Sequence, residues 1–162
     1  MSERETPCPD RLCTLRARLE SENLTCILQK GDNVLTSTQT GIRPLLEWID
    51  EKQDTRDGAA ADKIVGKAAA LLYVFMDVRA VYAEVLSASG LRALQAHGIR
   101  AEYGTLTDYI VNRAGTGMCP MEETVQTVSD PAEALAALRA TAARLRAASA
   151  QKTATDTAAF SS

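Results

Sequence analysis

Histidine is almost absent from this sequence, since His97 is the single one among 162 residues. Histidine is the commonest metal ligand and the usual general base, so its scarcity limits metal binding and conventional base catalysis. Long apolar runs are also missing: none approaches the roughly 20 residues that a membrane-spanning helix needs. Residues 1–10 lack the basic and apolar regions of a signal peptide. We therefore expect a cytoplasmic protein that makes no contact with a membrane.

Cysteine is too sparse and too scattered for a disulfide framework. The chain contains four, at Cys8, Cys13, Cys26 and Cys119. A chain of this length buries a core without such bridges, so the sequence predicts reduced thiols.

Positive charge is not in excess either. The formal net charge is −3, and the isoelectric point is about 5.2. Because duplex nucleic acid and anionic membranes attract clustered Lys and Arg, we expect neither as a partner. The hydrophobic share of 46% and the charged share of 24% are typical of one globular domain.

Residue patterns indicate an α/β fold. Apolar and polar residues alternate over 24–30, turn residues follow at 31–33, and a second strand is predicted at 34–38, which makes a β-hairpin. A short helix with proline in its first turn is predicted from Pro44.

The middle of the chain contains its most apolar segment. Residues 61–76 are apolar around most of a helical circumference, which predicts a central helix packed on a sheet. A strand at 80–86, a helix at 88–97 and a strand at 99–103 follow. This alternation predicts parallel pairing, and with the hairpin it predicts a mixed sheet.

The ends are expected to differ from the central domain, which spans 23–147. Leucines at helical spacing predict at most a short surface helix within a partly ordered leader, residues 1–22. An Ala-rich amphipathic helix is predicted at 130–147, and the polar residues 148–162 are typical of a disordered tail.

Three segments of the sequence resemble those of a known family. They are Ala-Asp-Lys-Ile-Val-Gly-Lys-Ala-Ala at 61–69, Val-Tyr-Ala at 81–83, and Asn112-Arg113 followed by Thr-Gly-Met-Cys-Pro-Met-Glu at 116–122. Together they resemble a family of small prokaryotic proteins of unknown function, over about residues 23–138. That family is associated with the cytidine-deaminase-like fold, so the resemblance implies an α/β three-layer sandwich with a mixed sheet and helices on both faces.

The zinc ligands of that superfamily are not at the expected places. A zinc deaminase begins one central helix with His or Cys, followed two positions later by Glu, and begins the next with Pro-Cys-x-x-Cys. By element order these places are 61–63 and 87–90, and neither holds a thiol or an imidazole. Zinc from elsewhere would need Cys119 and His97 to converge with a carboxylate. We therefore expect no metal, no cofactor and no zinc-dependent deamination.

Cys119 is the candidate catalytic residue. Cys119-Pro120 follows a glycine-bearing loop, which predicts a thiol at a helix N-cap with proline at the first helical position. Helix amides and Arg113 favour a thiolate there, and hence a nucleophile or a redox-sensitive thiol. The structural alternative, a small buried side chain at a tight junction, stays open.

The loop before Cys119 is a candidate anion-binding segment, because its glycines allow backbone N–H groups to converge near a helix start. Its predicted ligand-binding residues are Asn112, Arg113, Thr116, Gly117 and Met118. Glu122 already complements the dipole of the following helix and is placed to cap it. An anion would therefore also need a lysine from elsewhere, and Gly-x-Gly by itself is more often a turn.

Asp62, Lys63 and Lys67 are the remaining predicted ligand-binding residues. If 61–76 is a helix, the two lysines share one face at its start and open on the side where α/β sheets bind ligands. The alternative is that Asp62 favours the helix start and the lysines are solvated. Glycine lowers the stability of a helix interior, so the presence of Gly66 indicates close packing against a neighbouring element.

Three functions fit these residues. The first is a domain that binds a small anionic or nucleotide-like metabolite without zinc chemistry. The second is an enzyme or redox-sensitive protein that depends on Cys119, although such an enzyme lacks an obvious base. The third is a non-catalytic protein that binds a partner or forms a homo-oligomer through the Ala-rich helix.

Overall fold

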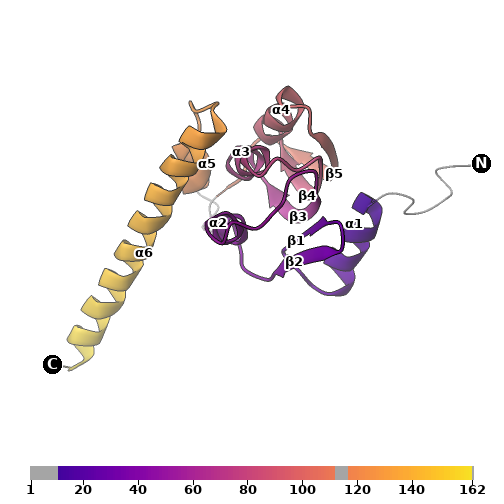
Figure 1. The fold of residues 1–162 in the computed structure, drawn as a ribbon. Coiled ribbons are helices and arrows are strands. Elements are labelled where there is room, and N and C mark those ends of the chain that lie inside the picture. The colour runs from indigo at the N-terminus through magenta and orange to yellow at the C-terminus, as the bar shows by residue number, and fades with distance from the viewer. Residues whose placement is uncertain (1–10, 112–116, 162) are drawn as a thin grey trace, which may run out of the picture.

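A five-stranded mixed sheet forms the centre of the molecule (Figure 1). The computed structural model describes residues 11–111 and 117–161, with side chains up to residue 148. The strands are β1 (Cys26–Lys30), β2 (Asn33–Ser37), β3 (Ala59–Val65), β4 (Ala80–Ser87) and β5 (Arg100–Thr107), in the order β2-β1-β3-β4-β5. Strand β1 is antiparallel to β2 and β3, whereas β3, β4 and β5 are parallel. The predicted hairpin and the predicted mixed sheet are confirmed.

Six helices occur in the described part of the chain. They are α1 (Arg11–Ser21), α2 (Arg43–Asp50), α3 (Lys67–Phe75), α4 (Ala88–Ala96), α5 (Pro120–Thr124) and α6 (Pro131–Ser161). Helix α1 covers one face of the sheet, where its leucines pack on Ile27 and Tyr82. Helices α3 and α4 lie over the other face, and α6 packs on α3. The sheet is therefore covered on both faces.

The predicted central helix at 61–76 is wrong in its first part. Residues 59–65 form β3, and the helix begins at Lys67. Ala59, Ala60 and Ala61 are buried on both faces of the sheet, so this strand is apolar without alternation and cannot be distinguished from a helix by its pattern. Asp62 and Lys63 therefore lie on a strand, where the first is buried and the second exposed.

The two ends contain more helix than the composition predicts. Leu12, Leu15 and Leu19 of α1 are at most 3% exposed, so this helix is part of the core and not a surface element. Helix α6 continues to Ser161, through residues that we expected to form a disordered tail. The domain boundaries stay predictions.

Cys13 is disulfide-bonded, contrary to our expectation of reduced thiols throughout. A single bridge forms without the dense cysteine framework of small secreted domains, so the sparse cysteines did not exclude it. Among the described residues, Cys26 and Cys119 are free.

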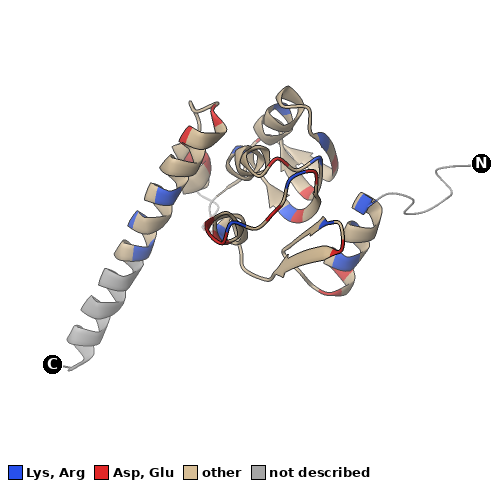
Figure 2. Ribbon diagram, in the orientation of Figure 1, with Lys and Arg blue, Asp and Glu red and all other residues tan. Residues whose placement is uncertain are grey.

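Residues of both charge signs alternate along the ribbon of the described part of the chain (Figure 2). Within residues 11–111 and 117–161, no helix is both long and apolar enough to cross a bilayer.

Candidate functional site

The start of α3 meets the start of α4 at the carboxyl ends of the parallel strands. Gly66 separates β3 from α3, and Ser87 ends β4 and caps α4 by accepting a hydrogen bond from the Gly90 N–H at 3.0 Å. A Cβ atom on Gly90 would lie 3.0 Å from the carbonyl carbon of Gly66. The close packing predicted for Gly66 is therefore observed. Two helix N-termini bring partial positive charge to this edge.

Glu122 fills the anion position at the start of α3. Its Oε1 accepts a hydrogen bond from the Lys67 N–H at 2.8 Å, and its Oε2 accepts one from the Ala68 N–H at 2.8 Å. The residue is 7% exposed. A Cβ atom on Gly66 would lie 2.4 Å from the Glu122 carboxyl carbon, so only glycine leaves room for this carboxylate.

This arrangement corrects our expectation that Glu122 caps its own helix. The carboxylate instead caps a helix that begins 55 residues earlier in the chain. Helix α5 spans only five residues and has little dipole of its own, whereas the first amides of α3 need acceptors.

Helix α5 is held beside α3 by several further contacts. The Lys67 Nζ donates to the Gln126 carbonyl oxygen at 3.2 Å. The hydroxyls of Thr124 and Thr141 are 2.7 Å apart and join α5 to α6. Val125 is fully buried in the core.

The segment that leads into α5 contains three of the predicted site residues. Met118 forms an isolated bridge with Val111, and the Cys119 N–H donates to the Ile110 carbonyl oxygen at 2.9 Å. Gly117, Met118 and Cys119 are half-buried. Cys119 is the N-cap of α5, with proline in the first turn as predicted, but its side chain makes no capping hydrogen bond.

The other predicted site residues are dispersed. Lys67 lies at the start of α3 beside Glu122. Asp62 and Lys63 lie on β3 and not at a helix mouth, because the helix begins later than we expected. Asn112, Arg113 and Thr116 lie outside the described residues.

A second polar cluster is buried between β1, β3 and α3. The Tyr73 hydroxyl donates to Asp62 Oδ2 at 2.7 Å and lies 3.2 Å from Cys26 Sγ. The Ile64 N–H donates to Asp62 Oδ1 at 3.3 Å. Sequence reasoning missed this cluster, because Cys26 and Tyr73 have the spacing of core residues. The one available signal was a carboxylate within an apolar stretch.

Burial controls the proton affinity of this cluster. Removal from water raises the pKa of Asp62 to about 7, although the hydrogen bond from Tyr73 opposes the shift. Burial, together with the nearby Asp62, also raises the pKa of the Cys26 thiol and of the Tyr73 hydroxyl well above their usual ranges. Cys26 is therefore a poor nucleophile, and Asp62 is the group that exchanges a proton near neutral pH.

The residues at the helix starts do not supply zinc ligands. The first helix begins at Gly66-Lys67-Ala68, not at 61–63, and the second begins at 87–90; neither place holds a thiol or an imidazole. His97 ends α4, where its Nδ1 lies 3.0 Å from the Ala93 carbonyl oxygen, at the other edge of the sheet. Within residues 11–111 and 117–161, no group of three His, Cys, Asp or Glu side chains is placed to hold a metal ion.

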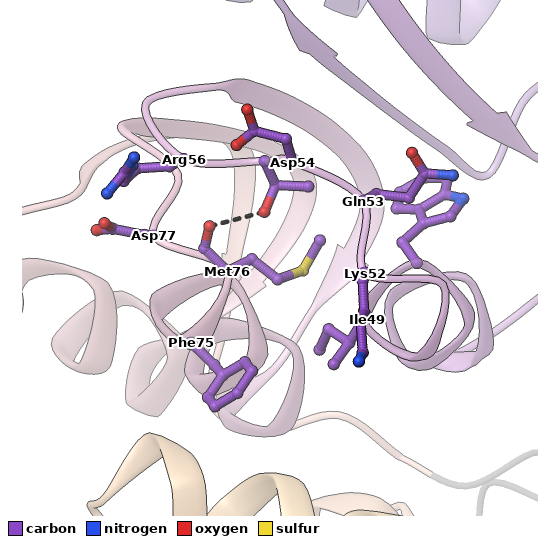
Figure 3. A pocket seen from close by; sticks show the side chains of 10 residues that line it. Ile49, Lys52, Gln53, Asp54, Arg56, Phe75, Met76 and Asp77 are labelled. Carbon is purple, nitrogen blue, oxygen red and sulfur yellow. Dashed lines mark hydrogen bonds between the residues drawn. The ribbon is translucent and has the colours of Figure 1, made fainter.

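Open cavities occur at the opposite end of the parallel strands, near their amino ends. One of about 310 Å³ lies between the ends of α2 and α3 (Figure 3). Lys52, Arg56, Asp54 and Asp77 line it with charges of both signs, and the Thr55 hydroxyl beneath it donates to the Met76 carbonyl oxygen at 2.7 Å.

A second cavity, of about 420 Å³, is lined by Asp57, Arg79 and His97 among others. Neither cavity contains a predicted site residue. We place the candidate site at the carboxyl ends of the strands, because the buried carboxylate and the helix N-termini meet there, although the two cavities described above lie elsewhere.

Comparison with known proteins identifies a family without assigning a function. The family described as TM1506, domain of unknown function (DUF1893), matches residues 14–141. No curated protein matches the chain. The crystal structure of a DUF1893 family protein from Thermotoga maritima is similar, with a TM-score of 0.72 and 25% identity over 78% of this chain and 86% of that one. The chain therefore belongs to the DUF1893 family, whose function is unknown.

Proposed function

We propose that this protein is a binding domain for a small carboxylate- or phosphate-bearing metabolite, nucleotide-like ligands included, and that it performs no zinc-dependent deamination. The observation that carries the proposal is the Glu122 carboxylate on the Lys67 and Ala68 amides, at 2.8 Å each. These amides bind a carboxylate within the protein, and a phosphate offers oxygen acceptors of the same kind.

The proposal includes a cytidine-deaminase-like fold. Support comes from the order β3-α3-β4-α4-β5, in which two helices begin side by side at the carboxyl ends of parallel strands. Zinc deaminases also hold their ligands at the starts of two helices. With glycine, lysine and serine in place of thiols and imidazoles, the same edge suits an anion better than a cation.

Thermal unfolding with and without ligands tests the proposal. We expect at least one compound, from a panel of nucleotides, phosphorylated metabolites and dicarboxylates, to raise the melting temperature saturably, because a ligand that binds only the folded state stabilises it. Sodium chloride at matched ionic strength is the control for general salt effects, because chloride lacks the oxygen acceptors of a phosphate or a carboxylate. A panel that gives no shift beyond that control contradicts the proposal.

The alternative is a protein that works through the Cys119 thiol. The observation that favours it is a free, half-buried thiol at an N-cap beside Pro120. Iodoacetamide labelling across pH tests it, with a Cys119→Ser variant as the blank. A labelling midpoint near that of an ordinary thiol, about 8.5, removes the case for a reactive residue.

A further inference from the structure

We propose that Glu122 is a built-in occupant of an anion site at the start of α3, and that α5 is a strap that withdraws this carboxylate when an external anion binds. The external ligand rests on the function proposed above. The occupant itself rests on the contacts of Glu122 alone.

The occupancy is complete in the structure. Each oxygen of the Glu122 carboxylate accepts a hydrogen bond from one amide of α3, and the residue is 7% exposed. Gly66 has no side chain, and even a methyl group there would collide with the carboxylate. A second anion therefore cannot bind these amides beside Glu122, so it must displace it.

The strap can move without unpacking the rest of the domain. Helix α6 is anchored independently, because Ala134, Leu135 and Leu138 are buried in the core that α3 shares. Between α5 and α6, residues 126–130 are exposed except for Val128, which is half-buried. Val125, directly after α5, is deeply buried, and Met121 of α5 packs against the same core while staying partly exposed. Opening of α5 therefore breaks the Glu122 contacts, two further hydrogen bonds and the packing next to α5, while the buried residues of α6 stay in place.

A truncation of Glu122 provides a direct chemical test. Glu122→Ala removes a CH₂–COO⁻ group, which is close to acetate in size and charge. If the start of α3 is a true carboxylate site, acetate from solution will bind the Lys67 and Ala68 amides in place of the lost side chain. Glu123 supplies the matched control, because it is the next residue of the same short helix and is exposed.

The experiment compares thermal unfolding of the wild type, Glu122→Ala and Glu123→Ala over increasing sodium acetate, with sodium chloride holding the ionic strength constant. We expect a saturable rise of several degrees in the melting temperature of Glu122→Ala, and no acetate-specific rise in the other two proteins. An equal response of Glu122→Ala and Glu123→Ala overturns the proposal.

Glu122→Gln keeps the test decisive if the alanine variant does not fold. Gln has nearly the same shape but no charge, so we expect faster amide hydrogen exchange in peptides covering 66–70 and 119–125, with the strands unchanged. If both peptides keep their wild-type protection from hydrogen exchange, the proposal that Glu122 holds α5 on α3 is overturned.

The outcomes separate the strap from the proposed function. Acetate rescue of Glu122→Ala, without any ligand for the wild type, supports the built-in occupant and contradicts the proposed function. A wild-type ligand whose affinity is unchanged in Glu122→Gln supports the proposed function and overturns the strap, because displacement of Glu122 would then play no part in binding.

Discussion

The protein buries two carboxyl groups to nearly the same extent and surrounds them differently. Asp62 is 6% exposed and Glu122 is 7% exposed. Asp62 receives one strong hydrogen bond from the Tyr73 hydroxyl and a longer one from a strand amide. Glu122 receives two short bonds from the first amides of a helix. Equal burial therefore does not imply an equal role, because the partners decide how well a negative charge is accommodated.

The two groups also join different parts of the fold. Asp62 links β3 to α3, which are neighbours in sequence, so it strengthens a contact that the chain connection already favours. Glu122 links α5 to α3 across more than fifty residues. Loss of Glu122 should therefore release a segment, whereas loss of Asp62 should change how the core responds to pH.

The largest effect is expected at Glu122. Glu122→Ala should lower the free energy of unfolding by about 3 kcal/mol, because the buried Ala68 N–H and the half-buried Lys67 N–H lose their charged acceptor. Urea denaturation measures the loss, and Glu123→Ala should stay within about 0.5 kcal/mol of the wild type. Equal stabilities of the two variants would show that Glu122 is no more important than a surface carboxylate.

Gly66→Ala should reproduce most of that loss. Its new Cβ would lie 2.4 Å from the Glu122 carboxyl carbon and so expel it from the amides. We expect a cost of about 2–3 kcal/mol, similar to an overpacked core. In the double variant with Glu122→Ala the costs should not add, because both remove the same contact. Simple additivity in denaturation experiments would contradict this.

Asp62 should make stability depend on pH. Its pKa of about 7 in the folded state exceeds that of an unfolded Asp, near 4, so between these values only the folded state holds the proton. The contribution of Asp62 is fully present below pH 4 and declines as pH rises to 7. We expect a difference of about 2 kcal/mol between pH 5 and pH 8 that is lost in Asp62→Asn. Parallel stability profiles of wild type and variant would rule this out.

The smallest effect is expected at Tyr73. Tyr73→Phe removes the hydroxyl that Asp62 and Cys26 share, at a cost of about 1 kcal/mol. Because this hydrogen bond holds the pKa of Asp62 down, the pH profile should also move to higher pH. Tyr109→Phe, at an exposed position, serves as the control. A loss of stability with no shift of the profile would separate Tyr73 from Asp62.

Local signals predicted much of the fold. The hairpin β1-β2, the strand β4 and the helix α4 follow from alternation, turn residues and the Gly98 stop. Strand β3 was mistaken for helix, because its alanines pack between two layers and so lose the alternation that marks a strand. Gly66, which we placed inside a helix, is the boundary between strand and helix.

The candidate site was predictable only in part. The N-cap position of Cys119 follows from local sequence, whereas Lys67 was predicted inside a helix that begins at 61 and instead begins α3. The contact between Glu122 and α3 does not, because it joins segments 55 residues apart and no spacing rule connects them. The same holds for Cys26 and Asp62, which become neighbours only when β1 pairs with β3.

The most direct measurement of the central claim is a titration of the isotope-labelled wild type with inorganic phosphate, followed by amide NMR shifts. The account predicts that the Lys67 and Ala68 amides move most and saturate together, with smaller changes in α5, because phosphate takes the place of Glu122 on these groups. Saturating shifts around Asp57 and Asp77, with Lys67 and Ala68 unmoved, would locate binding at the open cavities of the opposite edge and contradict the account.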